Sequence, residues 1–258
     1  MLITGASAGI GAEFARRLAS RGSDLVLVAR RADRLDALAS QLRAAHGVAV
    51  TTLPMDLALP GVGQRLRSGL GDAGVEVTAV VNNAGFANSG LFHTEDLADL
   101  QKEIALDVSS VVEISHAFLP SLRGQEGGFL ANVASMAAYQ AGPRMAVYGA
   151  CKAFVLSFTE ALWYEARDTD LRVLALSPGA TETEFFDIVG DAADGGSRRM
   201  AASDVVRTAL SALDRRNPPP SVIAGRSNRL AATLGRLVGR RRSVEVVGGM
   251  MTRAHAAA

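Results

Sequence analysis

Short apolar runs alternate along this chain with longer segments in which apolar residues recur at helical spacing. The runs lie at residues 1–3, 25–29, 48–53, 77–81, 129–133, 171–176 and 222–224. This alternation is typical of a parallel sheet whose faces are covered by the intervening helices. No internal repeat and no shift in composition marks a second domain. The pattern therefore predicts a single α/β domain.

Composition and charge exclude several classes of protein. A content of 48% hydrophobic and 21% charged residues is that of an ordinary globular protein, and the net charge of +1 gives no field that would attract a nucleic acid. The single cysteine, Cys151, permits no internal disulfide, and the four histidines lack the spacing of metal ligands, so we expect no metal. No apolar run is long enough to span a membrane, and the residues after Met1 do not form a basic signal sequence. We expect a cytoplasmic protein.

Three glycines, Gly5, Gly9 and Gly11, lie where the first run meets the first helical segment of a βαβ unit. A dinucleotide pyrophosphate binds such a turn because free backbone N–H groups point out of the positive end of the helix. Gly5 permits the tight turn, Gly9 the approach of the phosphate, and Gly11 the packing of helix on sheet. The spacing differs from G-x-G-x-x-G, so a purely structural turn stays the alternative.

The end of the second run indicates which dinucleotide is bound. An acidic residue there would bind the adenosine ribose and repel a 2′-phosphate. The sequence instead places Ala29, Arg30 and Arg31 there, which favours NADP over NAD. The alternative is that the arginines only solvate the start of a helix. Asp56, after the third run, either contacts adenine or is an ordinary turn aspartate.

Tyr148 and Lys152 are four residues apart, and Ser135 precedes the tyrosine by thirteen. Residues four apart share one face of a helix. A phenol with an ordinary pKa near 10 becomes a useful acid or base when an ammonium lies beside it. Lys152 is one of only two lysines in a chain whose other basic residues are arginines, which indicates that a compact ammonium is needed there.

Five motifs in sequence order resemble those of the classical short-chain dehydrogenase/reductases. They are Thr4-Gly5-Ala6-Ser7-Ala8-Gly9-Ile10-Gly11, Asn82-Asn83-Ala84-Gly85, Ser135, Tyr148-x-x-x-Lys152 and Pro178-Gly179. The resemblance covers residues 1–225 and implies a Rossmann-like, doubly wound parallel sheet of seven strands with helices on both faces. We expect residues 1–225 to form the NAD(P)-binding catalytic domain and residues 226–258 to form a basic, helical extension of it.

The resemblance also implies hydride transfer between a nicotinamide and a carbonyl or secondary alcohol carbon. Tyr148 is then the general acid or base, Lys152 lowers the pKa of its phenol and holds the nicotinamide ribose, and Ser135 hydrogen-bonds the substrate oxygen. We expect the following residues to bind the cofactor, with Arg30 and Arg31 included because of their charge: Gly5, Ser7, Gly9, Ile10, Gly11, Arg30, Arg31, Asp56, Asn82, Ala84, Gly85, Tyr148, Lys152, Pro178, Gly179, Thr181 and Thr183.

One catalytic position departs from the family pattern. Members usually carry an asparagine twenty-two residues past the glycine of the Asn-Asn-Ala-Gly motif, where it supports a water chain to the lysine, and this chain has Asp107. An ionised aspartate accepts hydrogen bonds but donates none, and it would hold Lys152 charged. We expect Asp107 on one helical face with Leu100, Ile104 and Val111. The alternative is a surface carboxylate.

The remaining segments are less regular. Residues 185–203 are rich in Gly, Asp and Ala, and indicate a mobile connection or a lid. Tyr139, Gln140, Phe86 and Met145 are expected to edge, with it, a mainly apolar substrate pocket.

Residues 226–242 contain six arginines, no acidic residue and four interleaved apolar residues, which predicts one basic amphipathic helix. Such a helix either packs its leucines at a subunit interface or associates with anionic lipid or a partner protein. We expect a homodimer or homotetramer.

Three functions stay open at this point: an NADP-dependent carbonyl reductase or alcohol dehydrogenase, a weakly active or non-catalytic NADP-binding scaffold or sensor, and surface association through the basic helix. Only three residues precede the glycine turn, whereas strands average about five or six, so we expect that the protein could begin upstream of Met1. The sequence names neither the substrate nor the direction of the reaction.

Overall fold

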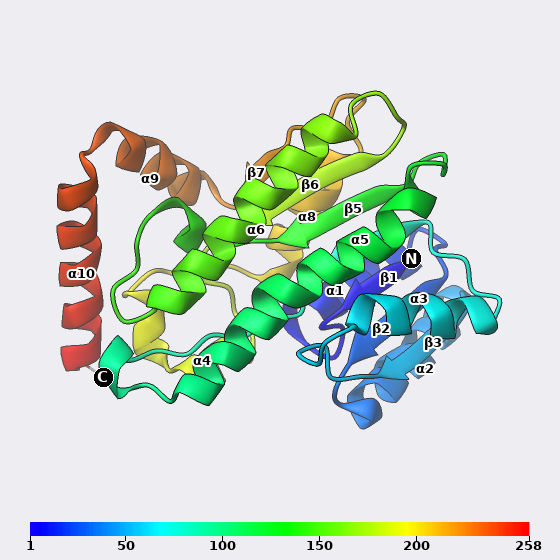
Figure 1. Cartoon of the computed structure of the whole chain (residues 1–258), viewed down its shortest axis with the longest axis horizontal. Coiled ribbons are helices and arrows are strands. Elements are labelled where there is room, and N and C mark those ends of the chain that lie inside the picture. The colour runs from blue at the N-terminus through cyan, green and yellow to red at the C-terminus, as the bar shows by residue number, and fades with distance from the viewer. Residues whose placement is uncertain (258) are drawn as a thin grey trace.

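A computed structural model describes residues 1–257, which form one seven-stranded parallel sheet (Figure 1). The strand order is β3-β2-β1-β4-β5-β6-β7. The strands are β1 (Leu2–Thr4), β2 (Leu25–Ala29), β3 (Val50–Pro54), β4 (Ala79–Asn82), β5 (Phe129–Val133), β6 (Arg172–Ser177) and β7 (Ser221–Ile223). Each predicted strand is present with bounds shifted by at most two residues, which confirms the predicted Rossmann-like fold.

Helices cover both faces of the sheet. In chain order they are α1 (Gly9–Ala19), α2 (Ala32–His46), α3 (Val62–Asp72), α4 (Leu97–Ile104), α5 (Ser110–Leu122), α6 (Ala146–Glu165), α7 (Phe185–Val189), α8 (Ala202–Leu213), α9 (Arg226–Leu237) and α10 (Arg240–Ala257). Buried side chains of α1, α2 and α8 pack on one face, and those of α3, α5 and α6 on the other.

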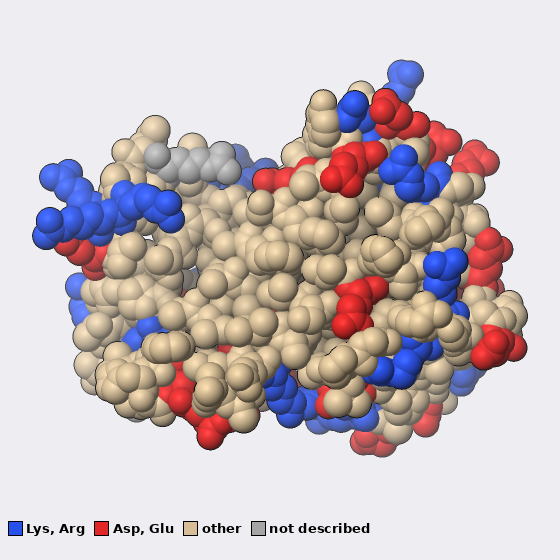
Figure 2. Space-filling view, viewed as in Figure 1, with Lys and Arg blue, Asp and Glu red and all other residues tan. Residues whose placement is uncertain are grey.

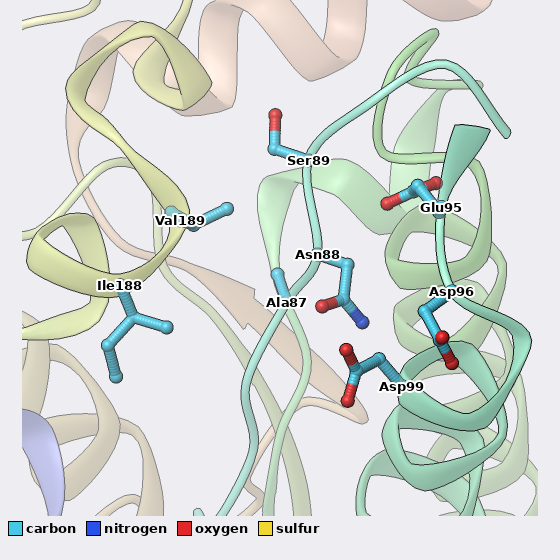
Figure 3. Close-up of a pocket in the computed structure, with 8 residues that line it drawn as sticks. All are labelled: Ala87, Asn88, Ser89, Glu95, Asp96, Asp99, Ile188 and Val189. Carbon is cyan, nitrogen blue, oxygen red and sulfur yellow. The ribbon is translucent and has the colours of Figure 1, made fainter.

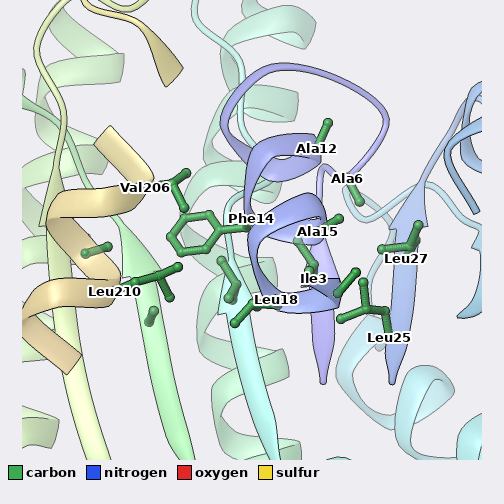
Figure 4. Close-up of a cluster of buried hydrophobic side chains, with 14 of the residues drawn as sticks. Ile3, Ala6, Ala12, Phe14, Ala15, Leu18, Leu25, Leu27, Val206 and Leu210 are labelled. Atoms are coloured by element: carbon green, nitrogen blue, oxygen red, sulfur yellow. The ribbon is translucent and has the colours of Figure 1, made fainter. Parts of the chain in front are cut away.

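β1 supplies both cores because successive side chains point to opposite faces. Ile3 of β1 joins the cluster under α1, whereas Leu2 joins the cluster under α3 and α5. Figure 4 shows Phe14 of α1 directed towards Val206 and Leu210 of α8. This double burial holds β1 in the interior of the sheet although it is only three residues long.

The predicted helix around Asp107 is interrupted by one π-helical turn, Ala105–Ser109. Asp107 is fully buried, as expected, but Ile104 is 44% exposed and Glu103 is buried in its place. The prediction for Ile104 was wrong because the buried side of the helix is centred between Glu103 and Asp107. The carboxylates of these two residues accept hydrogen bonds from backbone N–H groups of the segment after β4. Ile104 therefore lies outside this buried side.

The C-terminal segment forms two helices rather than the single predicted one. The backbone becomes extended at Val238, and α10 begins after Gly239. Leu230, Leu234 and Leu237 of α9 are 61%, 52% and 81% exposed. Figure 2 shows basic side chains gathered at the corner where α9 passes into α10. Within residues 1–257, no helix combines the length and apolar character needed to cross a membrane.

Candidate active site

The predicted site residues lie where parallel strands end at one edge of the sheet. β1 runs into the glycine turn, β4 into Asn83-Ala84-Gly85, β5 into Ser135, and β6 into Pro178. The chain reverses its direction of travel across the sheet at β1, which is flanked by β2 and β4. Ligands of open parallel sheets bind in the crevice at such a reversal.

The glycine turn has the geometry of an anion-binding loop. Gly5 and Gly9 have φ values of 64° and 55°, in the left-handed region that side chains disfavour. A Cβ on Gly11 would overlap the carbonyl oxygen of Gly5, so the turn and α1 pack too closely for any side chain there. No side chain caps the N-terminus of α1 at Ala8, which leaves that end open to an anion. Ile10 packs against the core beneath.

The Asn-Asn-Ala-Gly motif secures this turn. The Thr4 hydroxyl accepts hydrogen bonds from the backbone N–H groups of Asn83 (2.9 Å) and Ala84 (3.0 Å), and the Asn83 amide donates to the Thr4 carbonyl (3.0 Å). The Asn82 side chain instead points into the core, where it donates to Asn132 at 2.9 Å. The structure thus buries Asn82 behind the Asn83–Gly85 segment and leaves Ala84 partly exposed.

Ser135, Tyr148 and Lys152 come together as the spacing predicts. The Ser135 hydroxyl hydrogen-bonds the phenol of Tyr148, and the ammonium of Lys152 lies 5.6 Å from the centre of the Tyr148 ring. Burial raises the pKa of Tyr148, and the Lys152 charge and the Ser135 hydrogen bond act in the opposite direction. The expected lowering by Lys152 is present, but desolvation outweighs it.

Asp107 forms a buried ion pair with Lys152, with Oδ2 and Nζ 2.9 Å apart and side chains 0% and 6% exposed. Its Oδ1 accepts a hydrogen bond from the Phe86 N–H at 3.1 Å. Burial raises the pKa of Asp107. At Lys152 burial lowers the pKa, but the charges of Asp107 and Tyr148 and the hydrogen bond with Asp107 act together in the opposite direction, and the pKa of the ammonium is raised. A Cβ on Gly85 would lie 3.0 Å from both carboxylate oxygens, so Gly85 is required for this close approach.

The other predicted cofactor contacts lie on the loop after β6. The Pro178 carbonyl accepts from Met136 N–H at 2.8 Å, which joins this loop to the one that carries Ser135. Thr181 donates to the Gly179 carbonyl at 2.9 Å. A Cβ on Gly9 would lie 2.8 Å from Thr183 Cγ2, so this loop lies directly over the glycine turn.

Comparison with known proteins decides the family. The short chain dehydrogenase family model matches residues 1–193. The chain belongs to the short-chain dehydrogenase/reductase family. It is 37% identical over 220 residues to a sulfoacetaldehyde reductase of Chromohalobacter salexigens, across 83% of each chain. It is 34% identical to a serine 3-dehydrogenase of Agrobacterium fabrum, across 72% of this chain and 73% of the relative.

Two solved structures of this family share both sequence and fold with the chain. One is a short-chain dehydrogenase from Sphingobium yanoikuyae in complex with NADPH, at 36% identity and a TM-score of 0.80 over 91% of each chain. The other is a bulky-bulky ketone specific alcohol dehydrogenase from Comamonas testosteroni, at 30% identity and a TM-score of 0.75 over 92% of each chain.

At the adenosine end, the structure separates the two arginines that the sequence favoured. Arg31 donates to the Ser7 hydroxyl at 3.1 Å, whereas Arg30 is exposed and forms no ion pair within residues 1–257. Arg34, which the sequence analysis missed, joins Arg31 in binding Glu184. The i, i+3 spacing of Arg31 and Arg34 was a usable signal.

Asp56 lies in the turn after β3, where its Oδ1 accepts the Ala58 N–H at 3.0 Å. Such a self-contained turn is the ordinary role of an aspartate, and the second carboxylate oxygen stays available for adenine.

Glu103 is a second buried acid that the sequence analysis missed. Its Oε2 accepts hydrogen bonds from the Asn88 side chain at 2.7 Å and backbone at 3.2 Å, and burial raises its pKa to about 7. Asn88 in turn lines a cavity of about 290 Å³ between the segment 87–89, the start of α4 and the end of α7 (Figure 3). Glu95, Asp96 and Asp99 give this cavity an acidic wall.

An apolar cover lies over Tyr148. The Phe185 ring of α7 is 5.6 Å from the Tyr148 ring, and Met251 of α10 packs in the same cluster with Met145 and Ala87. The segment 185–203 therefore lies over the site as a lid would, and α10 adds to the cover, which the sequence analysis did not foresee.

Two of the predicted pocket residues line a cavity of their own. Tyr139 and Gln140 line a mainly apolar cavity of about 440 Å³ that extends over Ala146 and Ala150. These positions lie on the side of α6 opposite Tyr148, because they are two residues from it along a helix of 3.6 residues per turn. Phe86 and Met145 do not line this cavity, and a substrate pocket that joins all four residues stays a prediction.

Proposed function

We propose that the protein is an NADP(H)-dependent oxidoreductase that interconverts a carbonyl compound and the corresponding alcohol. The observation that supports this most strongly is the convergence of Ser135, Tyr148 and Lys152 beside the glycine turn. The structure of the relative from Sphingobium yanoikuyae is described as a complex with NADPH, which is in line with this choice of cofactor.

The residues of the chain suit a dinucleotide. The uncapped N-terminus of α1 and the two left-handed glycines, Gly5 and Gly9, would take the pyrophosphate. Arg31 and Arg34 already hold an oxyanion, the Glu184 carboxylate, and with Ser7 they form a donor set suited to a 2′-phosphate.

The remaining cofactor contacts are proposed from the resemblance, with Lys152 at the nicotinamide ribose. The other residues proposed to contact the cofactor are Ile10, Ala84, Gly85, Pro178, Gly179, Thr181 and Thr183, with Arg30 and Asp56 at its adenosine end and Asn82 supporting the site from the core.

NADPH, when bound, supplies the hydride. Ser135 orients the substrate carbonyl through its hydroxyl, which already faces the Tyr148 phenol. Tyr148 donates its proton to the carbonyl oxygen as negative charge develops there. Lys152, kept charged by Asp107, stabilises the phenolate that remains. In the direction of alcohol oxidation the same phenolate removes the proton.

The substrate class is best sought among the compounds that relatives act on. Relatives are named for sulfoacetaldehyde, serine and bulky ketones, which differ in size and charge. A carbonyl panel spanning these three types, followed by loss of reduced-nicotinamide absorbance, would find the class.

Tyr148→Phe tests the proposal. The variant should lose NADPH oxidation by about a thousandfold or more with a responsive carbonyl, while its NADPH affinity stays nearly unchanged. Tyr164→Phe is the matched control, because Tyr164 lies on the same helix, is 59% exposed and is remote from Ser135. Retained turnover in Tyr148→Phe would refute the assignment.

We also propose a cytoplasmic homodimer or homotetramer. The exposed leucines of α9, which include Leu230 and Leu237, support an assembly that covers them. Light scattering on the purified chain measures the mass, and a monomer at micromolar concentration would contradict the assembly.

A further inference from the structure

Glu184 binds the two arginines that the proposed function reserves for the cofactor. Its Oε2 lies 2.7 Å from Arg31 Nη1, and its Oε1 forms an ion pair with Arg34. The two guanidinium groups come from the end of β2 and the start of α2, whereas Glu184 belongs to the loop after β6, about 150 residues further along the chain. These hydrogen bonds lower the pKa of Glu184, so the carboxylate is ionised at neutral pH.

We propose that Glu184 is a specificity-determining residue that competes with the 2′-phosphate of NADP(H) for Arg31 and Arg34. This inference rests on the proposed NADP preference. A carboxylate and a phosphate monoester both take guanidinium donors in a bidentate manner, so the same N–H groups serve only one of them at a time. The Ser7 hydroxyl completes the donor set, and its oxygen lies 3.1 Å from Arg31 Nη2.

Charge decides which anion the pair prefers. Arg31 and Arg34 carry two positive charges, of which Glu184 neutralises one. A 2′-phosphate brings close to two negative charges at pH 7 and displaces Glu184, whereas NADH carries no such group and leaves the ion pairs in place. Glu184 therefore lowers the affinity for NADPH selectively and has no corresponding effect on NADH.

The position of Glu184 also connects the two ends of the site. Thr183, immediately before it, lies over Gly9 of the glycine turn, and Phe185, immediately after it, packs 5.6 Å from the Tyr148 ring. Release of Glu184 by the 2′-phosphate thus frees the start of the segment that covers Tyr148.

Glu184→Gln tests the inference by isothermal titration with NADPH, NADH and adenosine 2′-monophosphate, without turnover. The variant should bind NADPH and adenosine 2′-monophosphate roughly threefold to tenfold more tightly, the effect of removing one or two exposed ion pairs, while NADH changes less than about twofold. High salt should reduce the difference. Glu182→Gln is the matched control, since Glu182 lies on the same loop without an ion pair to any residue that the structure describes.

Arg31→Ala/Arg34→Ala separates this inference from the proposed function. If the double variant loses NADPH affinity and Glu184→Gln then has no further effect, competition at the arginines is supported. A different result is that the double variant loses NADPH affinity while Glu184→Gln alone leaves the affinities for NADPH and adenosine 2′-monophosphate unchanged, or raises the affinity for NADH equally. In that case the competition is refuted and the NADP preference stands. If the double variant weakens NADPH and NADH equally, the NADP preference itself fails.

Discussion

Replacing Asp107 by asparagine removes the only negative charge that the structure shows in an ion pair with Lys152 within residues 1–257. The side chains are isosteric, so packing is kept, but the hydrogen bonds are not. Asp107 accepts from Phe86 N–H through one oxygen and faces the Lys152 ammonium with the other, at 3.1 Å and 2.9 Å. An amide has a single oxygen, so its NH2 group must face one of these two donors.

The expected cost follows from burial. Breaking a buried ion pair by removing one partner costs about 3–5 kcal/mol. Asparagine keeps one acceptor and avoids burying a carboxylate, so we expect the lower limit, about 3 kcal/mol, or a fall in Tm of roughly 6–12 °C for a chain of this size. Asp107 raises the pKa of Lys152, so at every pH at which Asp107 is ionised this stabilisation is present below the ordinary lysine pKa of 10.5 and is lost as pH rises beyond it.

Urea unfolding at pH 7 measures the loss, with Asp99→Asn as the control because Asp99 is an exposed acid on the same helical segment. The pH profile of kcat/KM gives a second readout. Loss of the counter-charge lowers the pKa of Lys152, so the alkaline limb should move down by about one unit or more. An Asp107→Asn enzyme with unchanged stability and an unchanged alkaline limb would refute the role of the ion pair.

Two further substitutions test the scaffold of the site. Gly11→Ala should destabilise the protein by more than about 3 kcal/mol, because its Cβ would overlap the Gly5 carbonyl oxygen, whereas Gly69→Ala in an open helical position should be neutral or stabilising by about 0.5–1 kcal/mol. Thermal unfolding of both variants would show equal effects if the turn were not tightly packed. Burial raises the pKa of Glu103 to about 7, so the native state binds the proton more tightly and the wild type should lose about 3 kcal/mol of stability as pH rises from 4.5 to 7. Glu103→Gln should remove this dependence of stability on pH. Urea unfolding at a series of pH values measures it, and equal pH dependence in the variant and the wild type would contradict the prediction.

The architecture could be predicted from the sequence because it depends on local signals. Apolar runs, glycines that need positive φ and the spacing of Tyr148 and Lys152 each act over fewer than a dozen residues. The sheet order and the edge at which the motifs meet then follow from the rules of parallel α/β folds. The predicted convergence of Ser135, Tyr148 and Lys152 is confirmed by their contacts.

Several features could not be found in the same way. Ile104 satisfies the helical period, yet the bonds of Glu103 and Asp107 to the segment after β4 determine which side is buried. The break at Val238 is marked by no proline and only by Gly239, and because α9 also contains Gly235 in its interior, a glycine alone does not identify the break. Neither feature has a local signature strong enough to override the apolar pattern.

By itself, then, the sequence determined the fold, the family resemblance and which residues are proposed as catalytic, since all of these depend on spacing and residue type. The tertiary structure alone decided that Glu184 meets Arg31 and Arg34, that Arg30 points to solvent, and that α10 covers Tyr148. The physical reason is distance along the chain. Contacts between residues about 100 or more positions apart depend on how whole elements pack, and no periodicity or motif encodes them.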